Sequence, residues 1–455
     1  MKLLLVQVPT SHLGAGERVY PLGLSRLSSV VPNQVAGQAV DKRALDMNLS
    51  SLNLTDPWED LKTALEDFQP EIIALSFRNL DPLAGQSASY LSSLRTAARM
   101  ARLLAPEARI LAGGPAFSLF GVRLMEEIPE IDYGLIGEGE AVFPKLLEPT
   151  LAPHQLPGLV WRREGQVTAN ELGTKLHMDE IPPMDVDLFP PKAYTKGNAY
   201  VAAVGIEGKR GCDLSCGYCR YPFLGGTCMR LRSPSRIVDE MEYLHREHGI
   251  GLFHFTDGVV NRPVEHFEAL CQELLDRKLN ISWTGFFRED TLTDQNLALA
   301  QKSGLCAVYF SADALTQAGL NRLGKQLTMD QVLEASRVTA RANMLTMCHF
   351  LVNLPGDSVD DLPEIHANLD ALLEIHHPVG NLGAVIFNHI RLYPDAPVTR
   401  RLLRRGELPP DTDLLYPVFH NPPELAHLLH ELEGKCHTAN VFSRFGLKGN
   451  HPWNI

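Results

Sequence analysis

A chain of 455 residues is too long for one hydrophobic core, so its sequence predicts two or three domains. Its composition is that of a globular protein, and a net charge of −12 argues against a nucleic-acid-binding surface. The apolar run at residues 3–8 is short and lacks the cleavage site of a secretory signal, and no run of eighteen apolar residues is present. We therefore expect a cytoplasmic protein with no membrane span and no nucleic-acid partner.

Residues 1–150 alternate strand and helix patterns. Apolar runs predict strands at residues 3–8, 72–77, 110–112 and 133–136, with a more polar candidate at 38–45. This alternation predicts a doubly wound, Rossmann-like parallel α/β sheet, whose ligands bind beyond the carboxyl ends of the strands. Two such ends carry glycines and acids, namely Gly113, Gly114, Gly137, Glu138, Gly139 and Glu140.

Residues 151–196 change character, because prolines interrupt any long helix, and this segment is predicted to be a linker. A second alternation fills residues 197–395. Its strand candidates lie at 200–204, 252–256, 282–286, 307–311, 347–351 and 383–390. Six βα units predict a partial (β/α)6 parallel barrel with its active site at the carboxyl ends of the strands. Residues 396–455 are predicted to form a short helical C-terminal region.

Three of the eight cysteines, Cys212, Cys216 and Cys219, cluster after the first strand of the second domain. Their spacing allows three thiolates to converge from one loop onto three corners of a cubane, and thiolates are the usual ligands of iron–sulfur centres. One iron would then stay open for a substrate or cosubstrate. A structural zinc site is the alternative, but zinc usually takes four ligands in paired spacings, and only Cys228 is available nearby as a fourth.

The motif CxxxCxΦC, with Tyr218 as its aromatic residue, resembles the signature of the radical S-adenosylmethionine (SAM) superfamily, in which SAM chelates the open iron of a 4Fe–4S cluster. Segments 230–240, 254–258, 283–288, 352–357 and 390–394 look like the family's later elements, in order. The resemblance implies that Asp257 holds the SAM amino group and that Arg288 meets its carboxylate. Asp313 stands where relatives often carry Glu-Ser-Gly, and its role stays open. The alternatives are that Asp257 caps a helix and that Arg288 forms an ordinary ion pair.

A doubly wound domain ahead of such a barrel resembles the cobalamin-binding class of the superfamily. The loop at residues 76–81 resembles that of its tryptophan 2-methyltransferase branch. There is no DxHxxG motif, as in many members that are thought to bind cobalamin without a histidine ligand. The resemblance implies that Arg78 lies near the lower face of the cobalt, where a cation cannot ligate the metal and favours Co(I). The alternative is that Arg78 pairs with Asp81 or another carboxylate.

The resemblance implies an enzyme with a 4Fe–4S cluster, SAM and cobalamin. It would move a methyl group from SAM, through cobalamin, to an unactivated or sp2 carbon, or to phosphorus, of a small-molecule or peptide substrate. A low-potential donor such as flavodoxin or ferredoxin would supply electrons. Ring formation, rearrangement and 3-amino-3-carboxypropyl transfer are the enzymatic alternatives, and a non-catalytic iron–sulfur or cobalamin sensor is the alternative from another class.

Overall fold

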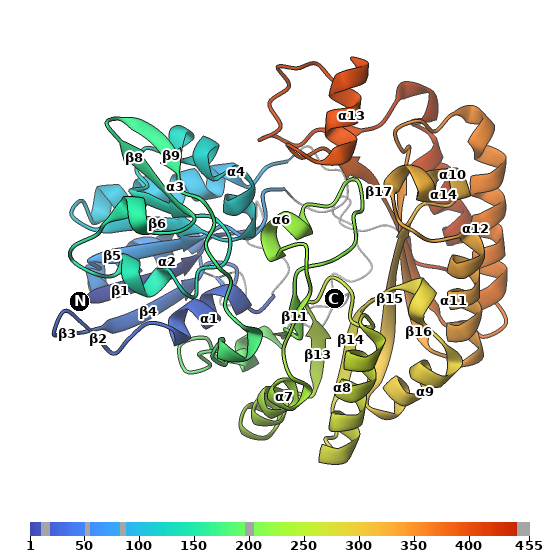
Figure 1. Cartoon of the computed structure of the whole chain (residues 1–455), viewed down its shortest axis with the longest axis horizontal. Helices are drawn as coiled ribbons and strands as arrows, with labels where there is room; N and C mark the ends of the chain where they lie inside the picture. Colours follow the sequence, from blue (N-terminus) through green and yellow to red (C-terminus); the bar gives the residue numbers. More distant parts are fainter. Residues whose placement is uncertain (11–18, 51–54, 82–87, 196–203, 444–455) are drawn as a thin grey trace. The chain divides into compact units, whose positions relative to one another are not determined.

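The computed structural model describes residues 1–10, 19–50, 55–81, 88–195 and 204–443. Two compact units are present (Figure 1). The first comprises Met1–Pro82 and Ala88–Asn198, and the second comprises Leu83–Ser87 and Ala199–Ile455. Among the described residues, no helix combines the length and apolarity needed to cross a lipid bilayer.

A seven-stranded sheet in the order β4-β1-β5-β6-β7-β8-β9 forms the centre of the first unit. Its parallel strands are β1 (Lys2–Gln7), β4 (Asp41–Asp46), β5 (Ile72–Ser76), β6 (Arg109–Gly113) and β7 (Tyr133–Leu135). β4 lies on one side of β1 and β5 on the other, so a topological switch point falls between the carboxyl ends of β1 and β5. In such sheets this is where a ligand crevice forms. The doubly wound prediction is confirmed.

The burial of each strand explains how clearly its apolar pattern could be recognised in the sequence. Leu3, Leu4, Leu5 and Val6 of β1 are each at most 1% exposed, as expected for a central strand covered on both faces. β4 is the edge strand and is more exposed, which accounts for the polar character of residues 38–45. That candidate divides into β3 (Gln38–Ala39), which pairs with β2 (Gln34–Val35), and β4.

The helices of the first unit connect the parallel strands. α1 begins after Pro21, and Asp56 caps α2 by accepting a hydrogen bond from the backbone of Trp58. The bounds are α1 (Leu22–Ser29), α2 (Pro57–Phe68), α3 (Leu91–Leu104), α4 (Pro115–Glu127) and α5 (Phe143–Leu146).

Residues 151–196, for which the sequence predicted a linker, extend the first sheet. β8 (Leu159–Arg163) and β9 (Gln166–Ala169) are antiparallel and join β7. Glu164 and Gly165 connect them with positive φ at both positions, which is the geometry of a tight hairpin turn. Three short 3-10 helices complete the segment: η1 (Pro153–Gln155), η2 (Met178–Glu180) and η3 (Pro191–Tyr194).

The second unit contains a sheet in the order β10-β13-β14-β15-β16-β17-β18. The first six strands are parallel and follow chain order, which is the topology of the predicted partial (β/α)6 barrel. They are β10 (Gly205–Ile206), β13 (Leu252–Phe255), β14 (Ser282–Phe287), β15 (Leu305–Asp313), β16 (Leu345–Val352) and β17 (Leu382–Arg391). Most of the predicted strand at 200–204 lies outside the described residues.

Helices follow the barrel strands, and Trp283 packs between this layer and the sheet with its side chain fully buried against Phe255 and Phe267. The longer helices are α7 (Pro234–His248), α8 (Val264–Arg277), α9 (Asp294–Lys302), α10 (Gln317–Leu323), α11 (Met329–Arg341) and α12 (Leu362–His376). The 3-10 helices η4 (Glu289–Thr291) and η5 (Val359–Asp361) precede α9 and α12.

The region predicted to be helical at the C-terminus contains α13 (Pro397–Arg405), η6 (Pro423–Leu425) and α14 (Leu428–Thr438). It also contains β18 (Phe419–His420), which adds antiparallel to β17. The region is thus built onto the barrel sheet as well as onto its helices. Residues 444–455 lie outside the described residues.

Candidate active site

The three clustered cysteines lie in a loop between β11 (Lys209–Arg210) and α6 (Tyr221–Gly225). β11 pairs with β12 (Arg230–Leu231), and the backbone N–H of Cys212 donates to the carbonyl of Gly226 at 3.0 Å. Gly211 has φ +86°, and a Cβ there would lie 2.2 Å from the carbonyl oxygen of Cys228. Only glycine fits this close approach. The start of the cysteine loop is therefore held in one conformation.

The loop provides the ligand chemistry that an iron–sulfur cluster needs. Cys212, Cys216 and Cys219 are all free and partly exposed. Burial raises the pKa of Cys219 to about 11, and the backbone N–H of Tyr221 opposes this by donating to its sulfur at 3.4 Å. Burial also raises the pKa of Cys216, whereas the nearby charges of Lys325 and Arg288 act in the opposite direction. Hydrogen bonds and cations around thiolates are the usual surroundings of such clusters, so the residues fit the group.

The three cysteines do not form a site for a single metal ion. Among the described residues, no three His, Cys, Asp or Glu side chains converge on a single-ion site. A cubane gives each thiolate its own iron, so its ligands need not meet at one point. The side chain of Cys228, the candidate for a fourth ligand, is exposed.

Tyr218 is held by a buried ion pair at the end of β15. Its hydroxyl donates to Asp313, and the Lys325 ammonium donates to the same carboxylate at 2.7 Å and to the carbonyl of Ser311 at 2.5 Å. Burial favours a low pKa for Lys325, but the charges of Asp313 and Cys216 outweigh it and raise that pKa. Asp313 therefore fixes the aromatic residue of the cysteine motif and keeps a positive charge close to Cys216.

Asp257 lies after β13 and is 2% exposed. Its Oδ1 accepts hydrogen bonds from the backbone N–H groups of Gly208 and Lys209, at 2.8 and 3.1 Å. Burial raises its pKa to about 6. The carboxylate thus supports the turn that leads into the cysteine loop. A contact between Asp257 and the SAM amino group stays a prediction.

The Arg288 side chain also forms hydrogen bonds within the barrel. Its Nε donates to Asp290 at 2.9 Å, and its NH2 group donates to the carbonyls of Lys325 and Gln326 at 2.7 and 2.9 Å. The ion pair is therefore present, and the buried Arg288 side chain also holds the backbone of Lys325. A contact between Arg288 and the SAM carboxylate stays a prediction.

Sequence reasoning missed two groups beside this site, Lys325 and Glu289. Glu289 is 4% exposed, and its Oε1 has no hydrogen-bond partner among the described residues. Burial raises its pKa to about 7, and the Lys325 charge opposes the shift. Neither residue belongs to a recognisable motif. Only tertiary packing shows that both are buried.

In the first unit, the predicted glycines allow the ends of β5, β6 and β7 to approach closely. Gly114 has φ +104°, and a Cβ there would lie 2.7 Å from the carbonyl oxygen of Phe77. Gly113 precedes it at the end of β6, where its carbonyl accepts a hydrogen bond from Phe77. Gly137 has φ +84°, and its N–H donates to Ser118 at 3.0 Å.

The two acidic residues that follow β7, Glu138 and Glu140, interact with other parts of the chain. Glu138 lies 3.7 Å from the Lys175 ammonium, and Glu140 is 8% exposed. Between them, Gly139 leaves room for Leu27, whose Cδ2 would lie 2.7 Å from an added Cβ. The structure therefore gives all these residues packing roles, and their contact with cobalamin stays a prediction.

Arg78 follows β5 at the switch point, and its charge interacts with that of Asp46 at the end of β4. Burial raises the pKa of Asp46, and Arg78 is among the groups that oppose this. The carboxylate also accepts hydrogen bonds from Asn48 and from the Tyr194 hydroxyl, the latter at 2.9 Å. Arg78 thus has a carboxylate nearby, and a position below the cobalt stays a prediction.

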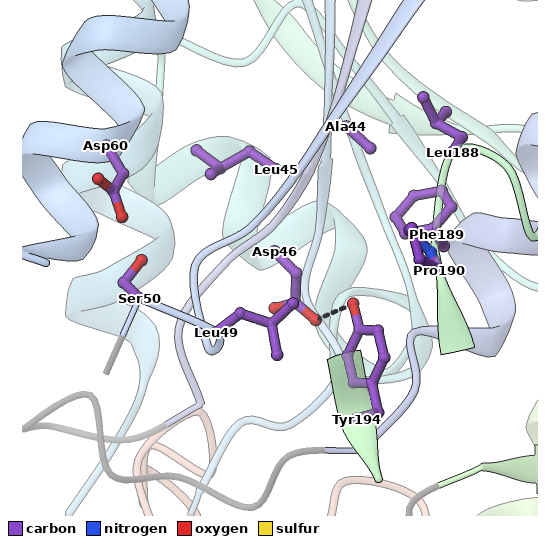
Figure 2. Close-up of a pocket in the computed structure, with 10 residues that line it drawn as sticks. All are labelled: Ala44, Leu45, Asp46, Leu49, Ser50, Asp60, Leu188, Phe189, Pro190 and Tyr194. Carbon is purple, nitrogen blue, oxygen red and sulfur yellow. Dashed lines mark hydrogen bonds between the residues drawn. The ribbon is translucent and has the colours of Figure 1, made fainter. Parts of the chain in front are cut away.

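A small cavity of about 240 Å³ lies beside Asp46. Figure 2 shows the Asp46 carboxylate and the Tyr194 hydroxyl pointing toward each other in its wall. Apolar side chains of residues 188–190, such as Phe189, line another side of the cavity. The volume is below the roughly 300–1,000 Å³ of most small-molecule pockets, and a corrin ring needs far more.

Comparison with known proteins gives two matches to family models. Residues 206–369 match the radical SAM superfamily, and residues 15–147 match the B12 binding domain. An uncharacterized methyltransferase of Pyrococcus horikoshii is 27% identical over 373 residues, which cover 80% of this chain and 76% of the relative. An anaerobic magnesium-protoporphyrin IX monomethyl ester cyclase of Cereibacter sphaeroides is 27% identical over 320 residues, which cover 68% of this chain and half of the cyclase.

Among solved structures, the radical SAM methyltransferase TsrM from Kitasatospora setae, with cobalamin and a 4Fe–4S cluster bound, has a similar fold. The TM-score is 0.71 at 20% sequence identity, and the match covers 89% of this chain and 78% of TsrM. The two family models fall on the doubly wound unit and on the barrel that carries the cysteine loop. The chain therefore belongs to the radical SAM superfamily, in the cobalamin-binding class that includes cobalamin-dependent methyltransferases.

Proposed function

We propose that this enzyme transfers a methyl group from SAM, through cobalamin, to carbon or phosphorus of a small-molecule or peptide substrate. The observation that carries the proposal is a three-cysteine loop on a barrel, joined in one chain to a B12-binding domain. The matched methyltransferase relative supports it over most of both chains. The cofactors supply the reactive methyl group and the electrons, while the protein positions them and excludes water.

The chain's own residues have separable tasks in this proposal. Cys212, Cys216 and Cys219 would hold the cluster. Hydrogen bonds donated by Tyr218 and Gly217 keep the cysteine loop in place. The Tyr218 hydroxyl donates to Asp313 at the end of β15, and the N–H of Gly217 donates to the carbonyl of Leu323 at 2.7 Å. A loop fixed before the cofactors bind loses little entropy when they do.

We further propose that Arg78 acts beneath the cobalt and favours its electron-rich state. Its place at the switch point supports this. Replacing Arg78 with alanine is expected to change the absorption spectrum of bound cobalamin and to lower the fraction that can be reduced to Co(I). Arg99→Ala is the matched control, because that side chain is 64% exposed on α3. Unchanged spectra and reduction in Arg78→Ala would remove this role.

Product analysis tests the proposed function directly. Anaerobic turnover is expected to release S-adenosylhomocysteine and to form methylcobalamin. Methylthioadenosine would instead indicate aminocarboxypropyl transfer, and deoxyadenosine without any methylated product would indicate a radical rearrangement or ring formation. No consumption of SAM by cluster-loaded protein under strong reductant would favour a sensor.

Ring formation is the second candidate, because a cyclase is as similar in sequence as the matched methyltransferase. The match spans only half of the cyclase but three quarters of the methyltransferase, which favours methyl transfer. As a radical SAM enzyme, the protein needs a reductant, and we propose a flavodoxin or ferredoxin in that role.

A further inference from the structure

α13 is an arginine-rich helix on the second unit (Figure 1). Its buried residues are Val398, Thr399 and Leu402, and four of its nine residues are arginine. Arg400, Arg404 and Arg405 are exposed, and Arg401 is half-buried. The pairs 400/404 and 401/405 place like charges four residues apart, which destabilises a helix by roughly 0.2–0.5 kcal/mol per pair.

Helix electrostatics explain only part of this pattern. Cations in the last turn of a helix interact favourably with its dipole, which accounts for Arg404 and Arg405. Arg400 and Arg401 are the fourth and fifth of nine residues, too far from the C-terminal end of the helix to gain the same stabilisation, and Arg400 donates to the carbonyl of Asp395 at 2.6 Å. The helix dipole therefore accounts for only two of the four arginines.

The arginine-rich helix contacts the cysteine loop. The backbone N–H of Val398 donates to the carbonyl of Gly217 at 2.9 Å, and Arg401 donates to the carbonyl of Arg322 at 3.4 Å. Arg220, which follows Cys219, interacts electrostatically with both Cys219 and Arg400. Positive charge thus extends from the outer face of α13 to a residue adjacent to a proposed cluster ligand.

The arginines outnumber the carboxylates beside them. Arg322 forms an ion pair with Asp357, Arg405 lies 3.6 Å from Glu407, and Asp395 interacts with Arg220. The Nε atoms of Arg220 and Arg401 are buried without a hydrogen-bond partner in the described part of the chain. A local excess of positive charge in a chain of net charge −12 fits a surface that meets an anionic partner.

We propose that α13 and Arg220 form the docking face for an acidic protein that carries a low-potential one-electron centre. This rests on the proposed cluster at the cysteine loop. The partner would lose one electron and a cluster held by the three cysteines would gain it, with no bond made or broken. Phe223, which is 37% exposed and lies 4.5 Å from the Arg220 guanidinium, offers an aromatic anchor.

A protein fits this face better than a small anion. The exposed arginines project from the outer side of a helix rather than into a cavity, and the described cavity lies in the other unit. Complementary charge over such a face accelerates encounter with an acidic protein and makes the rate fall with salt.

The test uses the double variant Arg404→Glu, Arg405→Glu of the cofactor-loaded enzyme, with an acidic flavodoxin as the probe. Titration calorimetry is expected to show affinity for the flavodoxin about 10-fold weaker than in the wild type at low salt, with little difference at high salt. Stopped-flow reduction of the cluster by the flavodoxin is expected to slow by a similar factor. Reduction by dithionite, a small reductant, is expected to stay unchanged.

The matched control replaces Arg246 and Arg337 with glutamate, because these side chains are 63% and 48% exposed on α7 and α11 of the same unit. It changes the net charge equally and is expected to bind like the wild type. Equal weakening in the control, or unchanged binding in the α13 variant, would overturn the proposal. The proposal would also be overturned if the α13 variant lost binding to a single-stranded RNA while its affinity for flavodoxin stayed unchanged. Because binding is measured without turnover, a failure of methyl transfer in every protein would count against the proposed function alone.

Discussion

Asp313 shows at the scale of one residue how the site is built. It adopts φ +65°, a conformation that aspartate tolerates better than most residues but at a cost. The hydrogen bonds from Tyr218 and Lys325 keep it there. Sequence comparison alone left its role open, because relatives often carry another residue type there and the pairing with Lys325 arises only in the fold.

Asp313→Asn is expected to destabilise the barrel by about 3–5 kcal/mol, because it leaves the Lys325 ammonium buried without its carboxylate. The midpoint of urea unfolding measures this, and iron content is expected to fall because an amide oxygen accepts the Tyr218 hydrogen bond more weakly than a carboxylate does. In Asp313→Asn combined with Lys325→Met, most of the stability is expected to return. Equal losses in the single and double variants would show that the ion pair is unimportant.

Cys228 provides a second test at this scale. Its side chain is exposed, and the loop already offers three thiols. Cys228→Ser is therefore expected to keep the full iron content after anaerobic reconstitution, whereas Cys212→Ser, Cys216→Ser and Cys219→Ser are each expected to lose the cluster. Loss of iron in Cys228→Ser would contradict the claim that only three cysteines hold the cluster and that one iron has no protein ligand.

At the scale of elements, buried strands could be predicted and edges could not. β1 and β5 are apolar apart from their terminal residues because both of their faces are covered. β8 and β9 are antiparallel strands at the edge of the sheet, with a mixed pattern among prolines, so a linker was predicted there. Glu164-Gly165 was a usable turn signal, since two-residue hairpin loops favour glycine.

Gly114→Ala tests the close approach of β5 and β6. The new Cβ would lie 2.7 Å from a backbone oxygen at φ +104°, so we expect a loss on the order of 1–3 kcal/mol in stability and weaker cobalamin binding. Unfolding midpoints and equilibrium dialysis with cobalamin measure the two effects. Gly23→Ala is the control, because this exposed helical glycine has open space around it, and it is expected to be neutral or stabilising.

His254 makes the barrel sensitive to acid. Burial lowers its pKa from 6.5 to about 4, and its Nδ1 contacts the Thr284 hydroxyl at 2.7 Å. Between these pH values the unfolded chain binds a proton that the folded chain does not, so stability falls as pH falls, by on the order of 3 kcal/mol in total. His254→Gln is expected to lose less stability between pH 7 and pH 5 in urea titrations. His430→Gln, at a side chain 75% exposed, is expected to behave like the wild type, and identical pH slopes in all three proteins would refute the assignment.

At the scale of the whole molecule, the cysteine spacing and two rounds of strand–helix alternation were enough to predict both units. The fold class was confirmed by the family-model matches and by the similarity to TsrM, and the cofactors by the radical SAM and B12-binding family models. The supporting groups were not predictable, because Lys209, Lys325 and Glu289 are buried by segments far away in the sequence. Lys209, for example, donates to the carbonyls of Val260 and Arg262, about fifty residues later.

The most direct test of the central claim is metal and cofactor analysis of the chain after anaerobic reconstitution with iron, sulfide and cobalamin. We expect about four irons and one cobalamin per chain. In Cys216→Ser we expect the iron to be lost and the cobalamin to remain, because the two groups belong to different units. One zinc in place of the irons, or a chain that retains no cobalamin, would contradict the account.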